Sequence, residues 1–264
     1  DVRVADLVER MPTLAGGRDD PRQAQAGEVL AGGGEAQAHA LGQGADVVAA
    51  YLNETEDAEE TRRLVEETGR ACLLFQGDIA DREVCRRLVR ETVDRFGRID
   101  VLVNNAAHQM TFEAIEDIPD EEWERTFAVN ISAMFYIAKA AVPHMPPGST
   151  IVNTASLEAY QPAPILLDYA ATKGAINNFT KGLAEQLGPK GIRVNAVAPG
   201  PIWTVQHVSY GEPEEKLPEF GHSTPIGRAG QPVEMAPAYV FLASPESSYV
   251  VGETLNANGG TPTP

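Results

Sequence analysis

Residues 46–75, DVVAAYLNETEDAEETRRLVEETGRACLLF, join two apolar runs through a polar segment that favours a helix. Asp46 to Tyr51 and Ala71 to Phe75 are short and mostly apolar, as strands buried on both faces of a parallel sheet are. Thr55 to Thr68 predicts a helix, with Thr at its start and Gly69 beyond its end. This order of strand, helix and strand predicts a parallel crossover unit.

The same alternation continues towards the carboxyl terminus. We expect helices at Asp81 to Phe96, Pro119 to Ala138, Asp168 to Leu187 and Pro232 to Ala243, and strands at Ile99 to Val103, Ser149 to Asn153, Ile192 to Ala198 and Glu253 to Asn256. Pro237 is expected to interrupt the last helix. The pattern predicts a single α/β domain with a doubly wound, mostly parallel, Rossmann-like sheet over residues 44–264.

Residues 1–43 do not fit this pattern. A dinucleotide-binding fold starts with an apolar strand, a tight Gly-rich turn and a helix whose amino terminus faces the pyrophosphate. Between Gly16 and Gly44, Val29-Leu30 is the only adjacent aliphatic pair, and Gly32-Gly33-Gly34 follows no recognisable buried strand. We therefore treat residues 1–43 as an atypical amino-terminal arm, a first unit of uncertain structure. A flexible loop and an altered sequence both remain open.

Composition narrows the classes of partner. The 264 residues carry 21 Lys and Arg against 38 Asp and Glu, a formal charge of -17, which argues against nucleic acid or an anionic membrane surface as a partner. Only Cys72 and Cys85 occur, and we expect both to be core residues rather than a disulfide. With no apolar run of membrane-spanning length, we expect a cytoplasmic protein.

One pair of residues indicates acid-base chemistry. Tyr169 and Lys173 are one helical turn apart near the start of a predicted helix, so they share a face. A neighbouring ammonium group favours the phenolate and lowers the pKa of a phenol, which makes Tyr169 usable in proton transfer. The hydroxyl of Ser156 can hold a substrate oxygen beside it. A Tyr packed under a Lys stem is the simpler alternative.

Further motifs follow in a fixed order along the chain. They are Asp78-Ile79, Asn104-Asn105-Ala106-Ala107, Asn130, Ser156, Tyr169, Lys173 and Pro199-Gly200-Pro201-Ile202 with Thr204. From about Gly44 to Gly260 the chain resembles the short-chain dehydrogenase/reductase family. Within it, the bacterial aldehyde and carbonyl reductases are the most similar group, and the glucose dehydrogenase branch comes second.

The resemblance implies roles for these residues. Ser156, Tyr169 and Lys173 are the expected catalytic residues, Lys173 also holding the cofactor ribose, and Asn130 carries a proton relay from Lys173. Asp78 and the Ile79 backbone are expected at the adenine, Asn105 and Ala106 beside the cofactor, and Pro199, Gly200, Ile202 and Thr204 at the nicotinamide carboxamide. The alternatives are a helix cap at Asp78, a buried structural Asn130, and a rigid turn at Pro199.

The end of the second predicted strand bears on cofactor choice. NAD-preferring members have a carboxylate there, whereas this chain has Tyr51. The absence of an acid at this position permits NADP. Glu54 and Glu56 follow, and no Arg stands nearby to pair with a 2′-phosphate, which argues the other way. We therefore expect NADP only by a small margin, with NAD possible. We predict no metal site, because His207 and His222 have no third ligand at suitable spacing.

These observations predict an NAD(P)-dependent oxidoreductase that transfers hydride between nicotinamide and a small carbonyl or alcohol substrate. We expect a homo-oligomer, as a tetramer, since family members often assemble so. The alternative is a catalytically silent binding or scaffold protein on the same fold, because the pyrophosphate-binding fingerprint is not recognisable.

Overall fold

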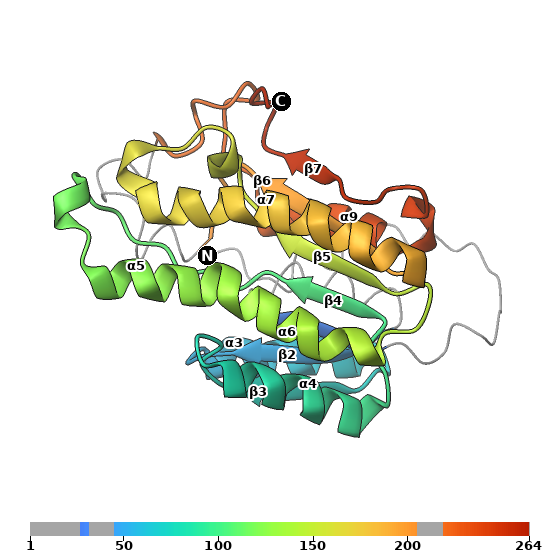
Figure 1. Cartoon of the computed structure of the whole chain (residues 1–264). Helices are drawn as coiled ribbons and strands as arrows, with labels where there is room; N and C mark the ends of the chain where they lie inside the picture. Colours follow the sequence, from blue (N-terminus) through green and yellow to red (C-terminus); the bar gives the residue numbers. More distant parts are fainter. Residues whose placement is uncertain (1–26, 32–44, 205–218, 264) are drawn as a thin grey trace.

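The computed structural model describes residues 27–31, 45–204 and 219–263. Within them, one seven-stranded sheet has the order β3-β2-β1-β4-β5-β6-β7, and all neighbouring strands are parallel (Figure 1). The strands are β1 (Gly27–Ala31), β2 (Asp46–Tyr51), β3 (Cys72–Gln76), β4 (Val101–Asn104), β5 (Thr150–Thr154), β6 (Arg193–Pro199) and β7 (Thr254–Ala257). The predicted doubly wound α/β fold is confirmed, and the strand order reverses between β1 and β4.

The first strand corrects the prediction for the amino-terminal segment. β1 forms around the Val29-Leu30 pair and lies between β2 and β4, with Val29 opposite Val48 and Leu30 opposite Val103. No strand was predicted here because β1 is a short run with one adjacent aliphatic pair, and its pairing with β2 and β4 decides its conformation. The sheet therefore includes part of the predicted arm, whereas Gly32-Gly33-Gly34 lies outside the described residues.

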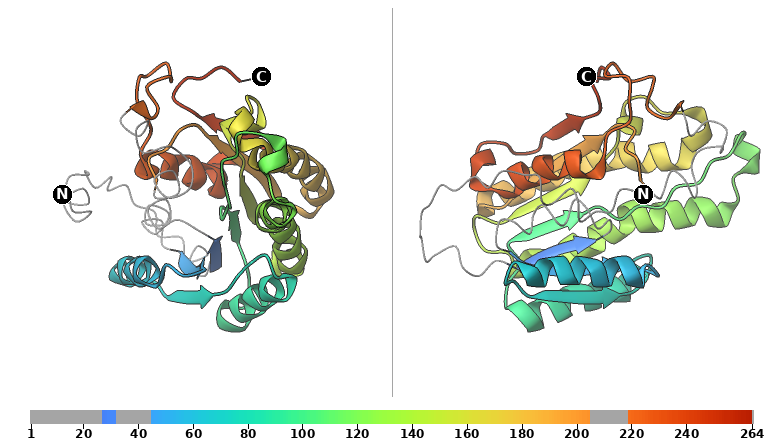
Figure 2. Two further views of the ribbon diagram at one scale, coloured as in Figure 1. Left: turned by 90° about the vertical axis from the view of Figure 1, so that its left-hand side faces the viewer. Right: turned by 180° about the vertical axis from the view of Figure 1, so that it is seen from behind.

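Helices cover both faces of the sheet (Figure 2). The α-helices are α3 (Thr55–Glu67), α4 (Arg82–Phe96), α5 (Asp120–Phe127), α6 (Ala133–Ala141), α7 (Leu167–Leu187) and α9 (Pro232–Ala243). Helices α4, α6 and α7 lie on one face, and α3 and α9 lie on the other. Pro237 lies inside α9 without ending it, so the predicted interruption does not occur.

Strand residues alternate between two apolar cores. Val48 and Leu102 pack into the core under α4 and α6, whereas Val47 and Val103 pack into the core under α3 and α9. Successive side chains of a strand point to opposite faces of the sheet, so a strand covered on both faces is apolar throughout. This explains why the short apolar runs predicted the strands well.

Asp78 and Asp81 both lie near the start of α4 but have different partners. Asp81 is the N-cap, and its side chain accepts a hydrogen bond from the Glu83 backbone N–H at 2.8 Å. Gly97 ends the helix with a left-handed φ of 81°. The helix cap is therefore Asp81, and the carboxylate of Asp78 has other partners.

The long helix predicted from Pro119 is not uniform. Helices α5 and α6 are joined by a π-helical turn, η3 (Ala128–Ser132), with Asn130 at its centre. Such turns inside α-helices are often found at functional sites. By length and composition alone, Asp120–His144 is long and apolar enough to cross a membrane, but 44% of its most apolar window is buried inside the protein. That burial is expected of a helix that covers a sheet.

Candidate active site

The predicted site residues gather at one edge of the sheet. Because the strands are parallel, the segments after β3, β4, β5 and β6 all emerge at the carboxyl edge. They carry, in that order, Asp78, Asn105, Ser156 and Gly200. Ligands of doubly wound sheets bind at this edge, near the reversal of strand order.

The structure brings Ser156, Tyr169 and Lys173 together. The Ser156 and Tyr169 side chains are hydrogen-bonded to each other. The Nζ atom of Lys173 lies 5.2 Å from the centroid of the Tyr169 ring and donates a 2.8 Å hydrogen bond to the Thr154 carbonyl oxygen. Tyr169 and Lys173 lie in the first turns of α7, whereas Ser156 directly precedes a 3-10 turn, η5 (Leu157–Ala159). The predicted grouping is thus present in the fold.

The ionisation of this group differs from the prediction. Burial lowers the pKa of Lys173 to about 7, and within the described ranges its amine is paired with a carbonyl rather than with a carboxylate. Burial also raises the pKa of the Tyr169 phenol above its usual range, and the hydrogen bond with Ser156 offsets only part of this effect. Lys173 does not lower the phenol pKa in this state, because the amine itself is only partly charged near neutral pH. The site therefore holds Tyr169 as a protonated phenol.

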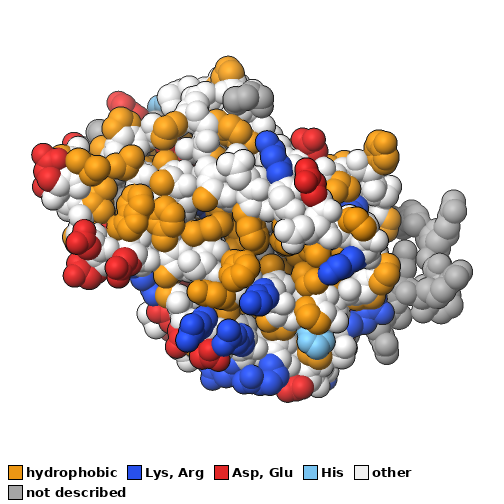
Figure 3. Space-filling view, viewed as in Figure 1, with side chains coloured by type: hydrophobic (Ala, Val, Ile, Leu, Met, Phe, Trp, Pro, Cys, Tyr) orange, Lys and Arg blue, Asp and Glu red, His pale blue; other side chains and the backbone are white. Residues whose placement is uncertain are grey.

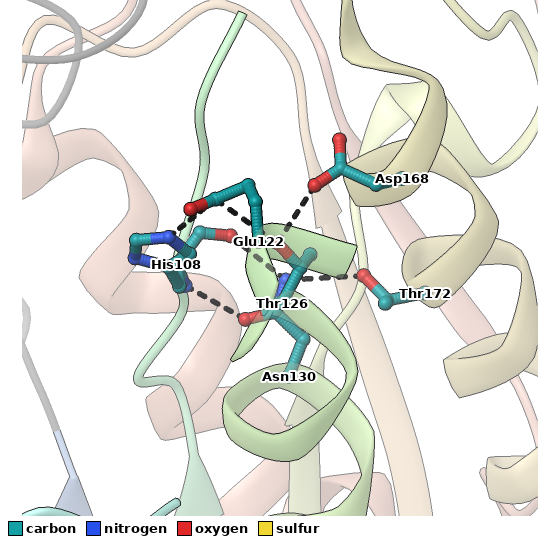
Figure 4. Close-up of polar contacts among 6 residues, drawn as sticks. All are labelled: His108, Glu122, Thr126, Asn130, Asp168 and Thr172. Carbon is teal, nitrogen blue, oxygen red and sulfur yellow. Dashed lines mark hydrogen bonds and ion pairs between the residues drawn. The ribbon is translucent and has the colours of Figure 1, made fainter. Parts of the chain in front are cut away.

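Asn130 connects three segments of the site (Figure 4). Its Oδ1 accepts from the His108 backbone N–H at 2.7 Å, and its Nδ2 donates to the His108 carbonyl at 2.9 Å. Nδ2 also donates to Thr172 Oγ1 at 3.1 Å, and Thr172 in turn donates to the Tyr169 carbonyl at 2.6 Å. The buried-Asn alternative therefore describes its contacts, and the predicted relay from Lys173 stays a prediction.

Asp78 is paired with a residue that sequence reasoning missed. Arg125 on α5 donates to Asp78 Oδ2 at 2.7 Å, and the Ala80 N–H donates to Oδ1 at 2.9 Å. Burial opposes ionisation of Asp78, but these hydrogen bonds hold its pKa below its usual value. Ile79, beside it, packs partly buried against the core under α4. A charged carboxylate thus stands just beyond the end of β3, and its predicted role at the adenine stays a prediction.

A second polar cluster surrounds Asn105. Its Oδ1 accepts from Thr154 Oγ1 at 2.9 Å, and the Tyr239 hydroxyl lies 2.8 Å from the same Thr154 oxygen. Burial raises the pKa of Tyr239 to about 12, which keeps this hydroxyl protonated. Ala106 packs, partly buried, against the core. The sequence pattern gave no signal for Tyr239, which comes from α9 on the other face of the sheet.

The segment after β6 is held tightly in place. The Gly200 N–H donates to the Ala257 carbonyl at 3.1 Å, and a Cβ at Gly200 would lie 2.7 Å from the Asn258 Cα. Ile202 is buried and forms a β-bridge with Gly230. These contacts agree with the alternative interpretation of Pro199–Ile202 as a rigid turn. Only a small residue fits at Gly200.

Three further predictions concern Thr204, a metal site and Tyr51. Thr204 is half-buried and borders residues 205–218, which are not described and include His207. In the ranges that the structure describes, no three His, Cys, Asp or Glu side chains form a group able to hold a metal ion. Tyr51 is the last residue of β2, as predicted, so that strand ends without a carboxylate.

The donor and acceptor set fits a dinucleotide. Among the described residues, the Lys173 amine donates only to the Thr154 carbonyl, which leaves its other N–H groups available to ribose hydroxyls. Asp78 offers a carboxylate acceptor at one end of the edge, and Gly200 and Ala106 present backbone with little side chain between. These features suit close approach of an extended ligand with hydroxyl and amine groups.

Comparison with known proteins gives the class. Residues 30–262 match the family model described as enoyl-(acyl carrier protein) reductase. The uncharacterized oxidoreductase YhdF of Bacillus subtilis is 51% identical over 218 residues, 83% of this chain and 75% of that protein. The NADPH-dependent aldehyde reductase 1 of Arabidopsis thaliana is 44% identical over 269 residues, 96% of this chain and 93% of that protein. A short-chain dehydrogenase of Burkholderia cenocepacia, solved in complex with NADP, superposes with a TM-score of 0.83 at 31% identity, covering 90% of this chain and 98% of its own.

The chain therefore belongs to the short-chain dehydrogenase/reductase family. It is an oxidoreductase, which confirms the predicted class of enzyme. Nothing in these comparisons favours the alternative of a silent scaffold protein.

Proposed function

We propose that the protein is an NADP-dependent reductase of small aldehydes or ketones that also oxidises the corresponding alcohols. The observation that carries this proposal is the group formed by Ser156, Tyr169 and Lys173, in which a hydroxyl and a buried amine flank one phenol. NADPH supplies the hydride when bound, and the protein supplies the proton and the orientation. The aldehyde reductase of Arabidopsis thaliana supports this choice of substrate and cofactor by its name.

Proton transfer follows from the ionisation of the site. Tyr169 is a protonated phenol in this state, which suits donation of a proton to the carbonyl oxygen of a substrate as hydride reaches the carbon. The Ser156 hydroxyl orients that oxygen by a hydrogen bond. With a pKa of about 7, Lys173 can return a proton to the phenolate near neutral pH. Each cycle then consumes one hydride and one proton for each carbonyl reduced to an alcohol.

The cofactor lies, in this proposal, along the carboxyl edge of the sheet. Asp78 and the Ile79 backbone receive the adenine, and Lys173 holds the nicotinamide ribose. Gly200, Ile202 and Thr204 border the carboxamide. NADP rather than NAD is favoured because Tyr51 ends β2 without a carboxylate that would repel a 2′-phosphate.

A fluorescence titration tests the proposal. NADPH and NADH are added to the protein, and enhanced nicotinamide fluorescence reports binding. We expect saturation with NADPH at lower concentration than with NADH, followed by oxidation of bound NADPH when an aromatic or aliphatic aldehyde is added. Failure to saturate with either cofactor at millimolar concentration would contradict the proposal and favour a scaffold role.

A homo-oligomer, expected as a tetramer, forms a further part of the proposal. Large apolar side chains are exposed on the face of the molecule formed by α5, α6 and α7 (Figure 3). They include Trp123, Phe135 and Leu167, each more than 40% exposed. Apolar side chains gathered on one face favour association. Light scattering after size exclusion measures the mass directly, and Trp123→Glu is expected to reduce it.

The cytoplasm is the proposed location. Cys72 and Cys85 are free thiols whose pKa values burial raises to about 11, so both are unreactive small core residues compatible with a reducing compartment. Fractionation of cells followed by immunodetection tests this proposal.

A further inference from the structure

A buried carboxylate lies next to Tyr169 and takes no part in the proton transfer described above. Asp168 is fully buried, and its Oδ2 accepts a 2.7 Å hydrogen bond from Thr126 Oγ1 on α5. Its Oδ1 has no hydrogen-bond partner among the described residues. The carboxylate therefore depends on one side-chain hydroxyl for its hydrogen bonding.

The hydroxyl of Thr126 has a choice of acceptors, and the distances decide it. Asp168 Oδ2 lies at 2.7 Å, whereas Glu122 Oε1 lies at 3.4 Å. A hydroxyl has one proton to donate, so Thr126 donates to Asp168. Glu122 is satisfied separately by the His108 ring, whose Nε2 lies 2.6 Å from Oε1 (Figure 4).

This bond is one of two bridges that fix the backbone on either side of Tyr169. The first joins Thr126 of α5 to Asp168, the residue before the phenol. The second joins Asn130 of η3 to Thr172, which donates to the Tyr169 carbonyl. Both bridges run from the same continuous helical stretch, so they hold the start of α7 at two points. The helical turn that carries Tyr169 is thus held at both of its ends. This leaves the Tyr169 side chain little freedom to move.

We infer that Thr126 and Asp168 are positioning residues for the catalytic phenol, acting through the start of α7 to hold Tyr169 against Ser156. The inference rests on the proposed function of Tyr169 as the proton donor. Charge also favours the arrangement, because a carboxylate in the first turn of a helix is stabilised by the helix dipole. Displacement of a reacting group by about 1 Å can lower turnover by about a hundredfold, so a partial shift should be measurable.

The test removes the hydrogen bond without changing shape. Thr126→Val is expected to lower kcat for aldehyde reduction about tenfold, while the dissociation constant for NADPH stays within about twofold. The limb of the pH profile governed by Tyr169 should move to higher pH, because a weaker contact with Ser156 no longer offsets burial of the phenol. Thr126→Ser restores the donor and should return both quantities towards the wild-type values.

Two further variants distinguish a loss of positioning from a loss of folding. Thr126→Val alone leaves a buried carboxylate without a hydrogen-bond donor, which can unfold the protein. The double variant Thr126→Val with Asp168→Asn removes the charge together with the bond, so it should fold and still show the low kcat. Thr92→Val is the matched control, because Thr92 is equally buried and donates to the Leu88 carbonyl at 2.7 Å within α4. It should leave kcat and the pH profile unchanged.

The outcomes separate this inference from the proposed function. Unchanged kcat and an unchanged pH profile in the folded double variant, with normal NADPH binding, would overturn the positioning role alone. A wild-type protein that binds no NADPH and reduces no aldehyde would overturn the proposed function, and with it the inference. A fall in kcat that Thr126→Ser does not rescue would also contradict the positioning role.

Discussion

The Nζ atom of Lys173 and the carbonyl oxygen of Thr154 lie 2.8 Å apart, and this is the hydrogen bond that the buried amine makes in the described part of the chain. A carbonyl satisfies one N–H group but does not compensate a positive charge as a carboxylate would. Burial therefore lowers the pKa of Lys173 to about 7. The Lys173 amine can therefore take up and release protons near neutral pH.

This shift predicts how stability depends on pH. Between about 7 and 10.5 the unfolded chain binds a proton at Lys173 that the folded protein does not. Stability must then rise with pH across this window, by at most about 1.4 kcal/mol per pH unit from this group. Urea unfolding of the wild type and Lys173→Met at about pH 7 and about pH 9 measures the effect. The free energy of unfolding should rise more with pH in the wild type than in Lys173→Met. Equal changes in both proteins would refute the lowered pKa of Lys173.

Glu158 also affects the pKa of the Tyr169 phenol. Its negative charge raises the pKa of Tyr169, although less than burial does, and burial raises the pKa of Glu158 itself. Glu158→Gln keeps an oxygen for the Ala163 N–H, which lies 2.6 Å from Oε2. We expect the limb of the kcat profile governed by Tyr169 to move to lower pH, by about half a unit. A limb that stays in place would show that this charge does not act on the phenol.

The ion pair between Arg125 and Asp78 predicts an effect on cofactor binding. Both side chains are partly exposed, so the pair should contribute little to folding, about 1 kcal/mol or less. Arg125→Gln should nevertheless weaken NADPH binding severalfold, because Asp78 loses the partner that fixes its direction. Arg70→Gln is the control, since Arg70 pairs with Asp46 at 3.0 Å near the start of β2, at the opposite edge of the sheet. Equal loss of affinity in the two variants would count against the adenine role of Asp78.

The sequence predicted the elements that its own local pattern determines. Asp46–Tyr51 and Pro232–Ala243 have the bounds expected, because a short apolar run and a Pro at the helix start are local signals. β1 was missed because its place between β2 and β4 depends on pairing with distant strands. Pro237 was expected to break a helix that continues through it, since packing against the sheet outweighs one lost hydrogen bond.

The candidate site was predicted to a similar degree. Ser156, Tyr169 and Lys173 could be grouped from spacing and family resemblance, and the fold brings them together. The partners that fix their geometry and charge could not, because Arg125 and Asp168 meet their partners only through tertiary packing. Ionisation was the largest error. Burial, which a sequence does not show, dominates the pKa values of the phenol and the amine.

Substitution of the phenol tests the account most directly. Tyr169→Phe removes one oxygen and keeps the ring, so the fold and NADPH binding should be largely unchanged. In rapid-mixing measurements with NADPH already bound, we predict that the rate of hydride transfer to an aldehyde falls by about 10³-fold or more, because the protonated Tyr169 phenol is the proton donor in the proposed reaction. A rate within about tenfold of the wild type would contradict the claim that Tyr169 is the acid-base residue of this enzyme.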